Sequence, residues 1–232
     1  MERFIMQDLI AWKNREDRKP LILLGARQVG KTYILKEFGQ REFENVAYIN
    51  CDNNAMVKDL FATDYNIERI LLTIGAITGV NIQAGKTLII MDEIQELHRG
   101  LASLKYFCED AREYHVAVAG SLLGLTLHQG ESYPVGKVNT LEMFPMTYEE
   151  FLLARGFKQR ADLLQSGMWD VVNSLRTLYI QHLREYYLVG GMPEAVKKFI
   201  DTNDANAVRE VQKEILHAYE KDISKQALRR AE

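Results

Sequence analysis

Short apolar runs alternate with amphipathic stretches from the amino terminus to about residue 145. The runs are Leu21–Leu24, Val46–Asn50, Thr87–Met91, Val116–Ala119 and Val138–Leu141, and each has the length of a buried β-strand. Strands that alternate with helices are typical of βαβ units, so this pattern predicts a parallel α/β sheet.

The stretches between the runs predict the helices. Phe4–Trp12 is expected to be a short amphipathic helix, and Lys31–Phe38 a second one that ends at Gly39 in a left-handed cap. Residues 55–82 predict two helices, with Asp52 or Asn54 placed to cap the first. The helix after the third strand has these inward positions: Leu101, Leu104, Phe107, Cys108 and Ala111.

After Pro145 the pattern becomes helical throughout. Thr147–Glu150 is a capping box, and Pro193 suits the first turn of a later helix. The last 24 residues form a charged helix that reaches Glu232 without a cap, as in a chain cut inside a longer protein. We therefore expect a core over residues 1–146 and a smaller helical or winged-helix segment over residues 147–232. Two helical stripes support this interpretation: Leu175, Leu178, Tyr179, His182, Leu183 and Tyr186, then Val211, Ile215, Tyr219 and Ile223.

The turn after the first strand carries the clearest chemistry. Gly25 to Thr32 fits G-x-x-x-x-G-K-T, in which glycines let successive backbone N–H groups point at one phosphate. The amino-terminal end of the next helix and the Lys31 ammonium add positive charge, and the Thr32 hydroxyl can bind Mg²⁺. The residues predicted to contact the nucleotide here are Gly25, Ala26, Arg27, Gln28, Val29, Gly30, Lys31, Thr32 and Tyr33.

The third and fourth strands end in polar residues that complete this site. Asp92 is predicted to hold Mg²⁺ beside Thr32, and Glu93 to polarise the water that attacks the γ-phosphate. Ser121 is a candidate contact to the γ-phosphate or that water, and equally a cap for a helix at Leu122–Leu127. With Lys31, Glu93 and Ser121 form the predicted catalytic set.

Composition narrows the function classes. The net charge of −3 gives no overall basic surface for nucleic acid. Two cysteines and five histidines show no metal-ligand spacing, and no signal peptide or apolar run of about 18 residues is present. The sequence favours a protein of the reducing cytoplasm without a membrane anchor.

The motifs together resemble a family. The chain looks like a prokaryotic AAA+-superfamily ATPase of the AAA_14 group, whose members usually carry a C-terminal DUF4143 domain that is missing from this sequence. The resemblance implies a P-loop three-layer fold with sheet order 5-1-4-3-2, and a Pro193 that packs on adenine as in a G-x-P motif. The resemblance rests on Gly25–Thr32, Met91–Gln95, Ala119–Ser121, Phe144–Phe151 and Gly190–Pro193.

One departure from the family pattern bears on the rate of ATP hydrolysis. Members of this group often show Gly-Arg where this chain has Gly136-Lys137, and lysine replaces a bidentate arginine finger poorly. Lys137 either approaches the γ-phosphate of a neighbouring subunit or is a solvated lysine in a turn.

We therefore predict an ATP-binding, Mg²⁺-dependent ATPase that drives a conformational switch and can self-associate, with an unknown protein partner. The rivals are a nucleotide switch that barely hydrolyses ATP, a DNA-associated ATPase and a phosphotransferase.

Overall fold

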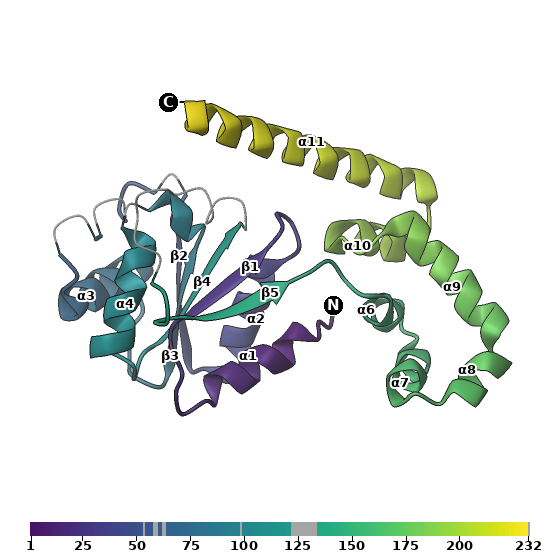
Figure 1. Ribbon diagram of the computed structural model, residues 1–232, viewed down its shortest axis with the longest axis horizontal. Coiled ribbons are helices and arrows are strands. Elements are labelled where there is room, and N and C mark those ends of the chain that lie inside the picture. Colours follow the sequence, from purple (N-terminus) through teal and green to yellow (C-terminus); the bar gives the residue numbers. More distant parts are fainter. Residues whose placement is uncertain (53, 58–59, 62–63, 98, 122–133, 232) are drawn as a thin grey trace. The chain divides into compact units, whose positions relative to one another are not determined.

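The computed structural model describes residues 1–52, 54–57, 60–61, 64–97, 99–121 and 134–231. The chain forms two compact units (Figure 1). One unit contains Ile5–Ala26 and Gly30–Met143, and the other contains Met1–Phe4, Arg27–Val29 and Phe144–Glu232.

A parallel five-stranded sheet forms the centre of the first unit, in the order β2-β3-β4-β1-β5. Read from the other edge, this is the predicted order 5-1-4-3-2, so the predicted fold class is confirmed. Every residue of β3 is buried, as expected for a central strand covered on both faces. The strands are β1 (Leu21–Gly25), β2 (Asn45–Asn50), β3 (Thr87–Asp92), β4 (His115–Ser121) and β5 (Asn139–Met143).

Helices cover this sheet. A hydrophobic cluster joins one face of the strands to α3 and α4, and the inward positions predicted for the helix after β3 are all buried. The opposite face carries Val46 and Leu88, which lie against α2. The helices of this unit are α1 (Ile5–Lys13), α2 (Lys31–Glu42), α3 (Ile67–Thr78) and α4 (Gly100–Asp110), with a short 3₁₀ helix, η1 (Ile94–Glu96).

Gly39 does not end α2, so the predicted left-handed cap is wrong. The helix continues to Glu42, and Gly39 is buried within it. A Cβ atom at this position would lie 2.6 Å from Cγ2 of Val46. The glycine therefore permits close packing of α2 on the sheet, a requirement that a local sequence pattern does not reveal.

The prediction of two helices over residues 55–82 is wrong for its first half. The described residues between Cys51 and Asn66 form turns, and only α3 is helical. Val57, Leu60 and Phe61 have helical spacing, yet they are buried in the sheet–helix core from an irregular segment. Asn66, rather than Asp52 or Asn54, caps a helix, by accepting a hydrogen bond from the backbone N–H of Arg69 at 2.9 Å.

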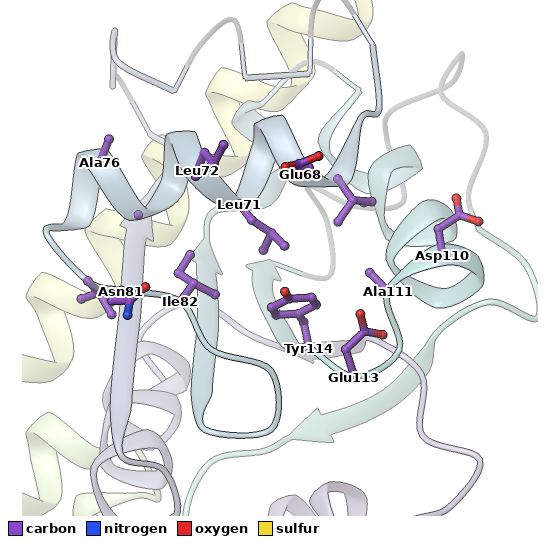
Figure 2. A pocket seen from close by; sticks show the side chains of 13 residues that line it. Glu68, Leu71, Leu72, Ala76, Asn81, Ile82, Asp110, Ala111, Glu113 and Tyr114 are labelled. Carbon is purple, nitrogen blue, oxygen red and sulfur yellow. The ribbon is translucent and has the colours of Figure 1, made fainter.

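A groove of about 560 Å³ lies between α3 and the connection from α4 to β4 (Figure 2). Leu71, Ile82 and Tyr114 line it, and the carboxylates of Glu68 and Glu113 flank it. None of its lining residues belongs to the nucleotide site predicted from the sequence.

The described residues after Met143 form helices only, in agreement with the helical alternative for this segment. Thr147 and Glu150 form the predicted capping box, and Pro193 is the first residue of α10. The helices are α6 (Tyr148–Ala154), α7 (Lys158–Ser166), α8 (Trp169–Ser174), α9 (Arg176–Val189), α10 (Pro193–Thr202) and α11 (Ala205–Ala231). No helix among the described residues is long and apolar enough to span a bilayer.

Candidate nucleotide site

The turn between β1 and α2 has the backbone geometry of a phosphate-binding loop. Gly30, which precedes α2, has φ 97° and ψ 23°, and Gln28 has φ 65°, so both residues are left-handed. Such conformations turn successive N–H groups toward one point, as the motif predicts. Val29 is buried, whereas Tyr33 is 55% exposed.

Lys31 folds over this loop. Its Nζ donates hydrogen bonds to the carbonyl oxygens of Gly25 at 2.9 Å and Ala26 at 2.8 Å. The residue is 8% exposed, so its charge is held close to the loop backbone. A buried cation at the amino-terminal end of a helix is suited to an anion with several oxygens.

Thr32 and Asp92, the two predicted metal ligands, lie together. The Thr32 hydroxyl donates to Oδ2 of Asp92 at 2.5 Å, although the residues are 60 positions apart. Asp92 is 4% exposed, and its Oδ1 accepts the backbone N–H of Glu93 at 3.1 Å. A hydroxyl and a carboxylate fit Mg²⁺, which commonly takes one or two protein oxygens and completes its octahedron with phosphate and water.

Glu93 has an unusual backbone. Its φ of 53° and ψ of 44° are left-handed, a conformation that costs free energy for a residue other than glycine. Its Oε2 accepts a hydrogen bond from Nε2 of Gln95 at 2.5 Å. The Asp92 and Glu93 carboxylates thus have different hydrogen-bond partners, and the sequence pattern does not predict the contact of Glu93 with Gln95.

Two further groups beside Asp92 were not predicted. The Tyr48 hydroxyl donates to Oδ2 of Asp92 at 3.2 Å, and the backbone N–H of Cys51 donates to the Asp92 carbonyl at 2.9 Å. Burial, together with the charge of Asp92, raises the pKa of both the Tyr48 hydroxyl and the Cys51 thiol to about 12. Both side chains therefore remain protonated and neutral at physiological pH.

Comparison with known proteins now adds to this geometry. The family model described as "AAA_14: AAA domain" matches residues 17–152, more than half of the chain. The chain belongs to this AAA domain family. A second model, a domain of unknown function (DUF8612), matches residues 180–232. No curated protein matches the chain.

Three solved structures show partial similarity to this chain. A RuvB mutant from Thermotoga maritima is 21% identical with a TM-score of 0.40, and the match covers 69% of this chain and 49% of RuvB. PCH-2 from C. elegans is 10% identical with a TM-score of 0.49, covering 91% and 67% of the two chains. Cdc6p from Pyrobaculum aerophilum is 13% identical with a TM-score of 0.40, covering 63% and 46%. This chain spans about half the length of the RuvB and Cdc6p chains.

The other predicted site residues of this AAA domain protein lie in different elements. Ser121 is the last residue of β4 and pairs in register with Gly25. The helix that it was expected to cap, Leu122–Leu127, lies outside the described residues. Pro193 belongs to the helical unit, where a Cβ atom on Gly191 would lie 2.3 Å from the Met146 carbonyl oxygen. Gly191 thus serves close packing, and the adenine contact of Pro193 stays a prediction.

Lys137 has an acidic partner within its own chain. Its Nζ lies 2.8 Å from Oε1 of Glu109 on α4, and this hydrogen bond, with the charge of Glu109, raises the pKa of Lys137. The residue precedes β5, at the amino edge of the parallel sheet, whereas Gly25 and Asp92 lie at the carboxyl edge. A role toward a neighbouring subunit stays a prediction, and it now requires Lys137 to leave Glu109.

Proposed function

We propose that this AAA domain protein binds ATP with Mg²⁺, hydrolyses it, and uses the cycle to change its conformation. The observation that carries the proposal is the contact of Thr32 with Asp92 beside a left-handed glycine loop. Membership of the AAA domain family also supports nucleotide binding.

Each residue of the site has a chemical role in this proposal. The loop N–H groups and Lys31 hold the β- and γ-phosphates, and the oxygens of Thr32 and Asp92 hold Mg²⁺. When bound, the metal neutralises charge on the phosphate oxygens. Glu93 accepts the proton of the attacking water, and its carboxylate must exchange the hydrogen bond from Gln95 for one to that water.

A slowly hydrolysing nucleotide switch is the second candidate. The observation that favours it is the ion pair between Lys137 and Glu109, because an arginine finger can contribute about 10³–10⁵ in rate and this lysine is already paired. We propose self-association as the condition under which Lys137 contributes. The DNA-associated ATPase and the phosphotransferase are tested by the additional measurements below.

The test is release of phosphate from Mg²⁺·ATP by the chain and by its Glu93→Gln variant. We expect hydrolysis to fall roughly 10²–10⁴-fold while ATP affinity is retained, because the amide cannot accept a proton. Glu113→Gln, an exposed acid at the other edge of the sheet, is the matched control and should hydrolyse ATP like the parent.

Additional measurements distinguish the candidate functions. A rate that increases with protein concentration supports self-association, and a rate that increases with DNA or with an acceptor supports those rivals. ATP binding without measurable phosphate release at any protein concentration favours the switch. Equal turnover in Glu93→Gln and the parent contradicts the assigned role of Glu93.

A further inference from the structure

Tyr48 reaches the predicted metal site from the neighbouring strand. Ala47 and Ile49 belong to the core that faces α3 and α4. Because side chains alternate along a strand, Tyr48 lies on the opposite face, toward α2. It pairs in register with Ile90, two residues before Asp92, and its hydroxyl lies 3.2 Å from Oδ2 of Asp92.

The Asp92 carboxylate is held on both oxygens. Oδ2 accepts the hydroxyls of Thr32 and Tyr48, and Oδ1 accepts the backbone N–H of Glu93. Thr32 comes with the phosphate loop, and Glu93 is fixed by its own backbone. Tyr48 is therefore the donor that holds the carboxylate from the side of β2.

The Tyr48 ring is itself fixed by α2. Nζ of Lys36 lies 3.4 Å from the ring centroid, and Lys36 is one helical turn after Thr32. A cation over an aromatic face is attractive, more so where solvent is partly excluded. The same helix thus positions both hydroxyls that meet at Oδ2.

We propose that Tyr48 is a positioning residue that holds the Asp92 carboxylate beside Thr32 and thereby sets how tightly Mg²⁺ couples to nucleotide binding. This inference rests on the proposed function. Hydrogen-bond partners of metal ligands typically change metal affinity by 10- to 100-fold. Because Asp92 accepts three hydrogen bonds from the described residues and the one from Tyr48 is 3.2 Å long, we expect the lower end of this range, roughly tenfold.

The test is Tyr48→Phe, which keeps the ring under Lys36 and removes only the hydroxyl. Binding of fluorescently labelled ATP is measured in EDTA and during a titration with MgCl₂. We expect affinity in EDTA to match the parent, and the Mg²⁺ concentration at half-maximal effect to increase roughly tenfold. Tyr187→Phe is the control, because Tyr187 is an exposed tyrosine on α9 that belongs to no predicted site. It should leave the titration unchanged.

The outcomes distinguish this inference from the function on which it rests. A Tyr48→Phe protein with an unchanged Mg²⁺ titration overturns the role of Tyr48 and leaves the nucleotide site intact. Equal weakening with and without Mg²⁺ also overturns it, because that result indicates general damage to the loop. A parent chain that binds no nucleotide under either condition contradicts both proposals.

Discussion

Glu150 forms a buried network that the capping box alone did not reveal. Its Oε1 accepts the Phe4 N–H at 2.7 Å and lies 3.1 Å from Nε of Arg3, while Oε2 accepts the Thr147 N–H at 3.0 Å. The Arg3 and Glu150 side chains are 6% and 4% exposed. Loss of the Glu150 charge should therefore lower the free energy of unfolding by much more than loss of an exposed ion pair would.

We predict that Glu150→Gln destabilises the fold by about 3 kcal/mol. Removing one partner of a buried ion pair typically costs about 3–5 kcal/mol, because the other charge is left uncompensated. Arg3 retains hydrogen bonds to the carbonyl oxygens of Val29 and Phe144, which favours the lower end. The glutamine must also turn an NH₂ group toward existing donors.

The assay is urea denaturation followed by far-ultraviolet circular dichroism. Glu149→Gln, one residue earlier in the same helical turn, should change the free energy of unfolding by less than about 0.5 kcal/mol. Arg3→Met combined with Glu150→Gln should recover part of the loss, because no buried charge then remains. A loss below about 1 kcal/mol in Glu150→Gln would refute the reasoning, since that is the size expected of an exposed pair.

Three further predictions test other parts of the structure. Gly39→Val should destabilise the protein by about 2 kcal/mol in the same urea assay, because the new Cβ meets Cγ2 of Val46 and overpacking costs about 1–3 kcal/mol. Equal stability of the variant and the parent would mean that α2 does not pack closely on Val46. Burial and the nearby Arg18 charge lower the pKa of His115 from 6.5 to about 4. The unfolded chain therefore binds more protons between these values, so stability should fall as pH decreases from about 6.5 to about 4, and urea titrations of His115→Gln across this window should show a shallower fall. At high protein concentration, Lys137→Arg should increase ATP turnover per subunit and Lys137→Ala should decrease it, with little change in ATP affinity. Identical rates in the parent and both variants would mean that Lys137 serves only its ion pair with Glu109.

The sequence predicts the strands well because each is a short apolar run, and the motif at Gly25–Thr32 determines a specific turn. The sheet order came from the family resemblance, since local patterns do not specify which strands are neighbours. The contact between Thr32 and Asp92 follows from two motifs that lie at the carboxyl ends of parallel strands.

The features that were missed depend on contacts between distant residues. Gly39 resembled a helix end because its close neighbours, Val46 and Leu88, come later in the chain. Tyr48 looked like an ordinary strand residue, and only the register of β2 with β3 brings it to Asp92. Glu150 was recognised as a cap, but the approach of Arg3 across 147 positions is a property of the folded unit.

The central claim is that the loop at Lys31 binds a nucleoside triphosphate with Mg²⁺. Thermal unfolding with and without Mg²⁺·ATP tests it most directly, in the parent chain and in Lys31→Ala. ATP at about 100 times its dissociation constant should stabilise the parent by about 2.7 kcal/mol. Lys31→Ala should still fold but gain no stability from ATP. An equal gain in both proteins, or no gain in either, would contradict the account.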